Sequence, residues 1–511
     1  MRVPIRLSTI ALGVCLAGCA VGPNYHDPKI KVPEGFAAAS KTAASAPGPG
    51  SQPVVDLATW WRTLNDPQLD SLIERAIQSN PSIEIALARL QQARTFEVAI
   101  TGVALPEVGA SAGGGRGTGS NLARGRISPP LNAASNTAGL HQINYIAGFD
   151  AAWEIDLFGR YRRAIEAARY DTEAAAAARN AVLITVVADV ARAYVDMRGL
   201  QMQLAVLRQN IRSAQTALDL AQARFDRGII NELDVTLARR QLASFQSQVA
   251  PLASQVSAAQ YAIAVLLGQF PEDLPKELDK PGLVPQVPEK IDPGLPLDLV
   301  RRRPDIREAE WQLAGATARI GVATANLFPR VAITAGWGGQ AQALGNPTVN
   351  QTIWSFGGLA TWPLLDFGTL DALVDIADLH THELLVNYKQ TVLNAVQEVD
   401  NAISGYSAQQ DRLRNLGDAL AASQRAVSLA TQRYDRGLTD YLNVVDAERQ
   451  EYDLAAQYAS AQMSAGEQFV ALYKGLGGGW EEYQTIPPIR KPQPAVIAAF
   501  RRVLAPEDPL K

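Results

Sequence analysis

An internal duplication limits the fold of this chain more than any other feature of its sequence. An early set of residues recurs 223 positions later, with Pro81, Ile83, Ala86, Leu90, Pro106 and Val108 returning as Pro304, Ile306, Ala309, Leu313, Pro329 and Val331. A later set recurs at a spacing of 209, with Gly159, Arg224, Gly228, Leu233 and Val235 returning as Gly368, Arg433, Gly437, Leu442 and Val444. The spacing shortens because the second copy lacks about fourteen residues between Pro329 and Gly368. The chain is therefore one unit written twice.

Each copy contains a long helical stretch without proline. Apolar residues recur alternately every four and three positions from Val186 to Phe225, which is a heptad seam, and the second copy keeps this seam from Val399 to Tyr434. The pattern predicts long helices over 160–227 and 369–436, with return helices over 231–267 and 440–474. Gly228 and Gly437 end the long helices. A helix of this size is about 100 Å long and must pack side by side with others, as an extended coiled coil or helical tube.

Four shorter segments alternate between apolar and polar residues, over 106–119, 144–158, 330–340 and 351–365. Their apolar positions include Tyr145, Phe149, Trp153, Trp337, Trp354 and Phe356. Such strands are typical of a transmembrane β-barrel, although one of them alone would equally fit a soluble sandwich. A single-chain barrel needs about eight strands, and an open sheet edge is prohibitive in lipid, so four strands predict a barrel shared between subunits. The Gly/Ser/Asn-rich stretches 113–144 and 338–350 are expected to be hairpin loops.

The N-terminus has the pattern of a secretory signal. Arg2 and Arg6 precede the apolar run 7–16, which is too short to span a membrane. The run ends before Cys19 in a sequence that resembles the bacterial lipobox, which predicts a signal peptide over 1–18 and a covalent lipid on Cys19. An ordinary cleavage site before a cysteine is the alternative. Ala20, rather than an aspartate, follows Cys19, and by resemblance to the sorting of Gram-negative lipoproteins this favours the outer membrane.

Composition and motifs argue against several other functions. The 47 basic and 51 acidic residues leave no positive excess for nucleic acid, and Cys15 and Cys19 are too few for a four-thiolate metal site. The G-x-S-x-G match at Gly109–Gly113 lies in a glycine-rich strand pattern instead of a strand-to-helix turn. His380 and His382 point to different sides of a helix. We therefore expect no enzyme activity, no metal and no cofactor beyond the lipid on Cys19.

These motifs together resemble one known family. The stretch 19–25 (Cys-Ala-Val-Gly-Pro-Asn-Tyr), the stretch 302–305 (Arg-Arg-Pro-Asp) and the duplicated Asp–Phe–Gly turns look like TolC-like outer-membrane efflux channels, and more narrowly like NodT-type lipoproteins of tripartite drug pumps. The resemblance covers 19–478. It implies an α+β membrane protein and a homotrimer, with a long α-helical coiled-coil barrel and four β-strands per chain in a shared twelve-stranded transmembrane β-barrel.

In that family the periplasmic helix tips form a gate. By motif, Leu442 resembles the apolar constriction, Asp446 the carboxylate ring, and Arg449 a tethering arginine. Tyr434 and Asp234 resemble the partners that lock neighbouring hairpins. Leu442 and Asp446 are four residues apart and share a helix face, so threefold symmetry would converge three carboxylates.

Two features weaken this assignment of a gate. Thr439 and Asn443 stand where the family pattern has an arginine and a second carboxylate, which weakens a charge-locked gate. The alternative is that Asp446 and Arg449 form an ordinary surface pair.

The resemblance implies an outer-membrane exit duct that exports drugs or other small toxic compounds, engaged by a periplasmic adaptor and an inner-membrane transporter of the RND type. A type I protein-secretion duct and a periplasmic structural or adhesive coiled coil are the alternatives. The expected organisation is a signal peptide (1–18), a lipid-anchored extended segment (19–56), a first repeat (57–270), a proline-rich connector (271–296), a second repeat (297–479) and a C-terminal tail (480–511).

Overall fold

The computed structural model describes residues 20–38, 56–118, 141–273, 275–288, 302–343 and 348–483. Two compact units divide the chain: one comprises Met1–Lys31, Gln92–Ala177 and Asp305–Val392, and the other comprises Val32–Gln91, Ala178–Pro304 and Leu393–Lys511. Both repeats contribute to each unit. Unit 1 takes the strands of both repeats, and unit 2 takes the helix hairpins of both, so the compact units cut across the duplicated sequence. Cys19 and the signal peptide lie outside the described residues.

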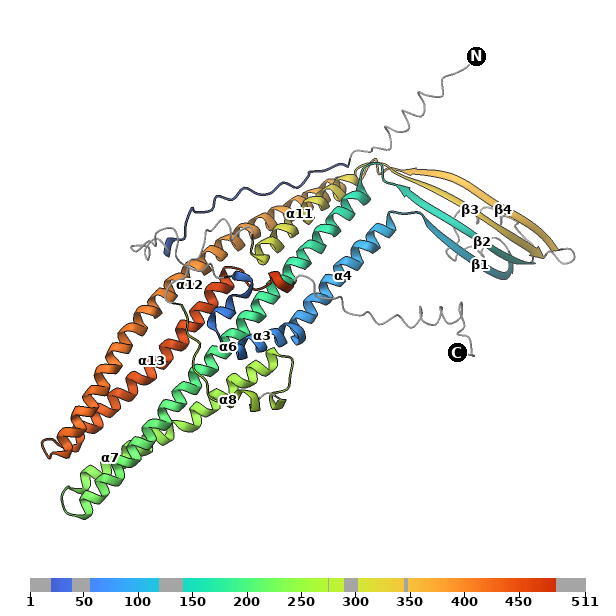
Figure 1. Ribbon diagram of the computed structural model, residues 1–511. Helices are drawn as coiled ribbons and strands as arrows, with labels where there is room; N and C mark the ends of the chain where they lie inside the picture. Colours follow the sequence, from blue (N-terminus) through green and yellow to red (C-terminus); the bar gives the residue numbers. More distant parts are fainter. Residues whose placement is uncertain are drawn as a thin grey trace. The chain divides into compact units, whose positions relative to one another are not determined.

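Unit 1 holds one four-stranded antiparallel sheet in the order β1-β2-β3-β4 (Figure 1). The strands are β1 (Glu107–Thr118), β2 (His141–Ile155), β3 (Arg330–Ala343) and β4 (Thr348–Thr361). Each strand pairs with its sequence neighbour, so β1 and β4 are the edges.

Residues 113–118 and 338–340 were expected both in strands and in hairpin loops, and the structure assigns them, together with 341–343, to strands. Gly113–Thr118 lies in β1, and Gly338–Ala343 lies in β3. Glycine fits here because β2 and β3 approach closely: a Cβ added to Gly338 would lie 2.6 Å from the carbonyl oxygen of Ala147.

Long helices make up most of the rest of the chain. They are α3 (Pro67–Ser79), α4 (Pro81–Val103), α6 (Arg160–Asp226), α7 (Glu232–Ser247), α8 (Val249–Leu266), α9 (Pro275–Leu278), α11 (Pro304–Ala325), α12 (Thr369–Asp435) and α13 (Tyr441–Gly475), with 3-10 turns at Leu57–Leu64, Pro271–Asp273 and Glu481–Tyr483. Helices α6 and α12 have 67 residues each, which corresponds to about 100 Å.

The return helix of the first repeat is divided at Gln248, whereas one helix over 231–267 was expected. Pro251 explains the break, because its nitrogen cannot donate a hydrogen bond to the carbonyl of Ser247 and its ring crowds that carbonyl. Helix α13, the counterpart in the second repeat, contains no proline and is continuous. The two return helices therefore differ in their regularity.

By length and composition, two helical stretches could cross a membrane. They are Arg160–Asp226 and Glu232–Leu266. In the most apolar stretch of 18 residues within Arg160–Asp226, 56% of the residues are buried inside the protein. Leu183 and Val190 on this helix are fully buried. Both residues belong to the hydrophobic core of unit 2. The apolar character of this helix is therefore weak evidence that it spans a membrane.

An aromatic cluster forms the core of unit 2. Trp60 is 1% exposed, and its ring stacks on Tyr473 with centroids 5.4 Å apart and meets Phe469 edge-on at 5.9 Å. Trp61 and Leu72 are buried beside them. This core fixes the 3-10 turn Leu57–Leu64 and α3 against α6 and α13.

An arginine clamps the extended N-terminal strap, residues 20–31, onto unit 1. Arg163 is 4% exposed, and its guanidinium donates to the carbonyl oxygens of Val21 (3.1 Å) and Gly22 (3.2 Å) and to Oδ1 of Asn24 (2.7 Å). Its remaining nitrogen donates to Glu166 at 2.7 Å. Gly22 has a positive φ and packs so closely on Gly321 that a Cβ would lie 2.4 Å from its Cα. The strap is therefore built into the fold of unit 1.

Two carboxyl groups meet between α6 and α13 in unit 2. Burial is the main cause that raises the pKa of Asp196 to about 7, and the neighbouring Glu467 adds to it through a hydrogen bond and its charge, while Arg192 opposes the shift. The helices are close here, since a Cβ on Gly466 would lie 2.6 Å from the side chain of Val195. The pair therefore favours holding a proton.

Candidate functional site

Two helix hairpins in unit 2 place the predicted gate residues at their turns. Gly228 ends the α6 side and Gly437 the α12 side, each with a φ of 72°. The backbone nitrogen of the residue after each glycine donates to the carbonyl oxygen five positions earlier, Ile229 to Arg224 and Leu438 to Arg433. This is the Schellman arrangement that glycine favours at the end of a helix. Both repeats thus reverse direction by the same geometry.

A small apolar cluster holds the two hairpin tips together. Its buried members are Ala221, Val235, Ala238, Tyr434, Tyr441, Val444 and Val445, which come from both repeats. The rings of Tyr434 and Tyr441 lie 5.2 Å apart and are tilted. The tips of α6–α7 and α12–α13 therefore share one local core.

Arg224 links the two hairpins electrostatically. Its guanidinium carbon lies 4.6 Å from the centre of the Tyr434 ring, and its Nη2 donates to Oδ1 of Asp435 at 3.1 Å. The hydroxyl of Tyr434 is buried and has no hydrogen-bond partner among the described residues. Within one chain, Tyr434 therefore packs with Arg224.

Asp234 lies near the tip in the first turn of α7. Asn231 caps this helix by accepting from the backbone nitrogen of Asp234 at 3.2 Å. Burial, with a smaller contribution from Asp440, raises the pKa of the Asp234 carboxyl above its usual range. A carboxyl group from the second hairpin therefore lies close enough to act on Asp234 at the tip.

Leu442, Asp446 and Arg449 lie on the first turns of α13. Leu442 is 56% exposed, and its counterpart in the first repeat, Leu233, is 60% exposed. Asp446 is exposed and accepts from Arg449 at 3.2 Å and from Gln450 at 2.8 Å. In a single chain, Asp446 and Arg449 therefore form a surface pair on one helix, which is the arrangement that the alternative interpretation describes.

Sequence reasoning missed Arg224 and also the pair Tyr441 and Glu448. Burial, followed by the charge of Glu448, raises the pKa of Tyr441, and burial and Glu451 raise the pKa of Glu448. Tyr441 and Glu448 are seven residues apart on α13, so the heptad spacing could have indicated that they share a face, whereas the turn at Gly437 separates both from Tyr434 on α12. Arg224 had no such signal, because its partner lies 210 positions away.

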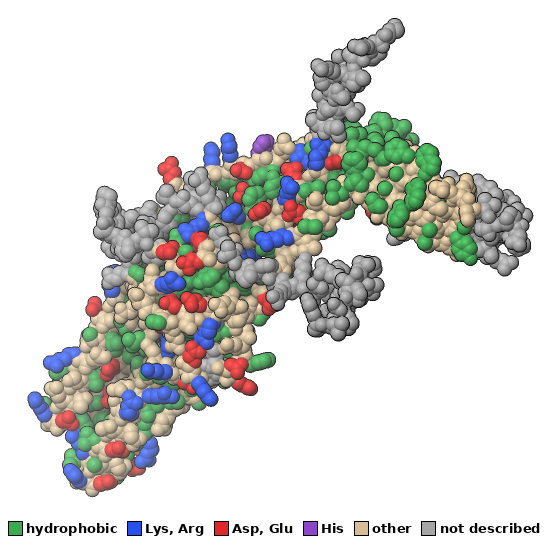
Figure 2. Space-filling view, turned by 45° about the vertical axis from the view of Figure 1, so that its right-hand side comes forward, with side chains coloured by type: hydrophobic (Ala, Val, Ile, Leu, Met, Phe, Trp, Pro, Cys, Tyr) green, Lys and Arg blue, Asp and Glu red, His purple; other side chains and the backbone are tan. Residues whose placement is uncertain are grey.

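The sheet separates its side chains into two unlike faces. The register places Phe149, Trp337 and Trp354 directly opposite one another across β2, β3 and β4. Trp337 is 61% exposed and Trp354 is 76% exposed. Figure 2 shows hydrophobic side chains gathered over the strands, whereas charged side chains lie over the helical parts. One face is therefore an exposed apolar band, made of the positions that the alternation predicted.

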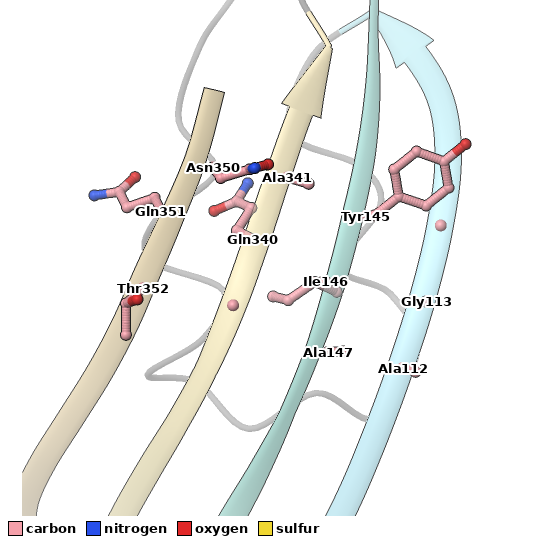
Figure 3. Close-up of a pocket in the computed structure, with 12 residues that line it drawn as sticks. Ala112, Gly113, Tyr145, Ile146, Ala147, Gln340, Ala341, Asn350, Gln351 and Thr352 are labelled. Carbon is pink, nitrogen blue, oxygen red and sulfur yellow. The ribbon is translucent and has the colours of Figure 1, made fainter. Parts of the chain in front are cut away.

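The opposite face is polar and rich in glycine. One cross-strand row contains Gly113, Ile146, Gln340 and Gln351, and it borders a hollow of about 720 Å³. The amide side chains of Gln340 and Gln351 come from β3 and β4, whereas Asn350 belongs to the neighbouring row with Ala341 and Tyr145, on the other face (Figure 3). Ile146 and Tyr145 also border the hollow, which otherwise has uncharged amides and small residues along its edge and no charged side chain.

The catalytic and metal candidates remain separate from one another. Gly109, Ser111 and Gly113 lie in the middle of β1, and His380 pairs with Glu383 on the surface of α12 at 3.2 Å. Within the described ranges, no group of three or more His, Cys, Asp or Glu residues could hold a metal ion. Cys19, the predicted lipid site, falls outside those ranges.

The duplicated strand and helix pattern has a match among known families. A model of the outer membrane efflux protein family matches residues 72–269 and 295–478. The chain belongs to the outer membrane efflux protein family. The two matched segments correspond to the two repeats, so both halves of this efflux protein carry the family pattern.

Relatives of this efflux protein cover nearly its whole length. It is 31% identical over 488 residues to the pyoverdine export outer membrane protein OpmQ of Pseudomonas putida, covering 94% of this chain and 99% of the relative. It is 29% identical over 477 residues to nodulation protein T of Rhizobium leguminosarum, covering 93% and 97%. A solved structure of the outer-membrane channel OprN is 33% identical, covers 91% of this chain and all of that one, and superposes with a TM-score of 0.79. The efflux protein therefore has a TolC-like fold and is an outer-membrane efflux channel.

Proposed function

We propose that this channel is the exit duct of a tripartite efflux system that exports drugs or other small toxic compounds. The observation that carries the proposal is the four-stranded sheet with an exposed apolar face, joined in both repeats to helices of 67 residues. Relatives are named for export of pyoverdine and of toluene. A periplasmic adaptor and an inner-membrane transporter, of the RND type, complete the assembly.

The channel works as a homotrimer in this proposal. Four strands leave β1 and β4 with unpaired backbone edges, which lipid does not tolerate. Three copies supply twelve strands, enough to close a barrel, and their long helices supply a tunnel. The apolar face turns to lipid, and the face with Gln340 and Gln351 lines the lumen.

Lipid on Cys19 anchors the channel to the outer membrane. The clamp of Arg163 on the strap supports this part of the proposal, because it fixes the chain that follows the cysteine to unit 1. Several acyl chains on one residue would hold the protein firmly to a bilayer.

The hairpin tips form the gate. Leu442 and Asp446 are both exposed on the first turns of α13. Three copies around one axis would set three Leu442 side chains and three Asp446 carboxylates against each other, giving an apolar constriction beside a cation-attracting ring. Arg449 holds each carboxylate, while Tyr434 and Asp234 contribute to the contact between hairpins.

The test combines export with conductance. Deleting the gene should raise accumulation of small toxic compounds in the host, and the wild-type gene should restore export; unchanged susceptibility would contradict the export role. In planar bilayers, Asp446→Asn should reduce cation selectivity. Asp453→Asn, on the same helix seven residues further from the tip, is the matched control. Equal effects of both variants would contradict the carboxylate ring.

The two alternatives make different predictions. A protein-secretion duct would lose export of a polypeptide on deletion without a change in compound accumulation. A periplasmic coiled coil would stay soluble without detergent as the Cys19→Ala chain. The exposed Trp337, Trp354 and Phe356 count against that second alternative.

A further inference from the structure

Two tryptophans end the apolar face of the sheet at matching positions. The indole nitrogen of Trp153, near the end of β2, donates to the carbonyl oxygen of Ala104 at 3.1 Å. The indole nitrogen of Trp362, directly after β4, donates to the carbonyl oxygen of Leu327 at 3.0 Å. The two tryptophans are 209 positions apart, which is the spacing that relates the two copies of the sequence. Because tryptophan is enriched where an apolar surface meets water, the pair marks one edge of the apolar face.

The two turns that follow these tryptophans differ in what covers their side chains. In the first repeat, the ring of Phe158 stacks on Phe328 with centroids 4.6 Å apart. The counterpart of Phe158 in the second repeat is Phe367, which is 90% exposed. Leu364 and Leu365 in the same turn are 77% and 76% exposed. The second turn therefore presents three large apolar side chains that its own chain does not cover.

The turn of the second repeat is held in a defined conformation. Asp366 caps α12, since its carboxylate accepts from the backbone nitrogens of Leu370 (2.8 Å) and Gly368 (3.3 Å). Its carbonyl oxygen accepts from the hydroxyl of Thr369 at 2.7 Å. Phe367 has a φ of 53°, a left-handed conformation that is costly for a residue with a Cβ and that persists only where the surroundings impose it. The cap therefore keeps the Phe367 ring at the surface in spite of this cost.

The matching turn of the first repeat carries the chain that follows the predicted lipid site. The backbone nitrogen of Val21 donates to the carbonyl oxygen of Phe158 at 3.1 Å. Ala20 lies so close to Gly159 that a Cβ added to the glycine would be 2.6 Å from the Cα of Ala20. Cys19 precedes Ala20 in the sequence. In the proposed lipoprotein, one turn thus has the covalent lipid beside it, and its counterpart has exposed apolar side chains instead.

We propose that the turn between β4 and α12 is a second membrane anchor, which inserts Leu364, Leu365 and Phe367 into the leaflet of the outer membrane that faces the periplasm, an assignment that rests on the proposed lipid-facing side of the sheet. Both leucines follow Trp362 within three residues, or at most about 10 Å of extended chain. The interfacial layer of a bilayer is about 5–10 Å deep, so these side chains reach it.

Lipid is the occupant because the turn directly continues β4, whose exposed apolar face turns to lipid in the proposed channel. The sequence of the turn suits this environment. From Trp362 to Gly368 it contains one charged residue, Asp366, and that carboxylate is engaged in the cap of α12. A turn that is already fixed also loses little conformational freedom when it inserts.

Fluorescent labels on single cysteines test the anchor. Leu365→Cys, labelled with NBD and reconstituted in phosphatidylcholine vesicles, should be quenched by lipids brominated on their acyl chains about as strongly as a label at Phe356→Cys on β4. Both should be quenched several-fold more than a label at His382→Cys, which is exposed about 20 Å further along α12. Iodide in the water should quench in the reverse order. Leu364→Cys is an independent variant of the same turn, and the parent chain, treated alike, corrects for any labelling of Cys19.

The other outcomes would overturn the anchor. Strong quenching of the Leu365 label by iodide would place the turn in water. Protection from both quenchers would mean that protein covers the turn, and it would equally refute insertion into lipid. The Phe356 label separates the two levels: if brominated lipid fails to quench it as well, the proposed orientation of the sheet is wrong, whereas quenching at Phe356 without quenching at Leu365 refutes the anchor alone.

Discussion

The contact of Arg224 with the neighbouring hairpin gives the sharpest prediction about gating. Replacing Arg224 by Ala removes its packing on the Tyr434 ring and its ion pair with Asp435. A cation–π contact is worth about 0.5–2 kcal/mol, and an ion pair of this exposure contributes roughly 0.2–1 kcal/mol. Together they stabilise the association of the two hairpins by about 1–2 kcal/mol in each protomer.

That free energy should appear as a change in the opening equilibrium. Since about 1.4 kcal/mol is a tenfold change, Arg224→Ala should raise the ratio of open to closed states by about five- to thirtyfold for each protomer that opens independently. Single-channel recording in planar bilayers measures the ratio directly. Arg224→Lys should lie between wild type and Ala, because lysine keeps the charge but not the flat group that lies against the ring.

Arg433 provides the matched control for this experiment. It is the repeat counterpart of Arg224, carries the same charge and is exposed. Arg433→Ala therefore changes the net charge of the tip equally without removing the contact to Tyr434. Equal open probabilities for the two alanine variants would refute the reasoning and would indicate that only net charge matters at the tip.

Two further predictions concern pH and the N-terminal strap. Because the pKa of Asp196 is raised to about 7 in the folded protein, above about 4 in the unfolded chain, its proton stabilises the fold fully below pH 4, and this contribution is lost as the pH rises through 7. Asp196→Asn should thus raise the melting temperature at pH 8 and change it little at pH 4. The expected gain in the free energy of unfolding at pH 8 is about 1–2 kcal/mol after allowance for partial exposure. Equal shifts at both pH values would contradict this. Arg163→Ala should cost about 2–4 kcal/mol of strap attachment and speed tryptic cleavage at Lys29, and an unchanged cleavage rate would show that the clamp does not hold the strap.

The strand faces and the helix turns could be predicted from the sequence, because each depends on the type of residue at a few regularly spaced positions. Alternation placed Phe149, Trp337 and Trp354 on one face, and the strand register brings all three into one row. The glycines Gly228 and Gly437 marked the two turns, since a positive φ there favours a residue without a Cβ. Pro251 lies within the return stretch and could have indicated the break between α7 and α8.

Contacts between distant segments gave no periodic signal. The stacking of Trp60 on Tyr473 and the packing of Arg224 on Tyr434 each depend on how two remote helices are set against each other. The bonding of Asp446 depends on side-chain conformation, because both a surface pair and an inward-facing ring are compatible with the same spacing. Sequence therefore predicted which turns carry the proposed gate residues but not the contacts that these residues make within one chain.

The free edges of the sheet have a genetic consequence. Strands β1 and β4 each present unpaired backbone groups, so in the proposed trimer no copy satisfies its own edges. A variant that blocks only the β4 edge, while folding normally elsewhere, would still offer β1 to a wild-type neighbour and would leave the ring open. If such a variant and the wild type were produced equally and mixed at random, about one trimer in eight would contain wild-type chains only. Alleles of this kind should therefore be dominant over the wild type, whereas alleles that prevent folding altogether should be recessive.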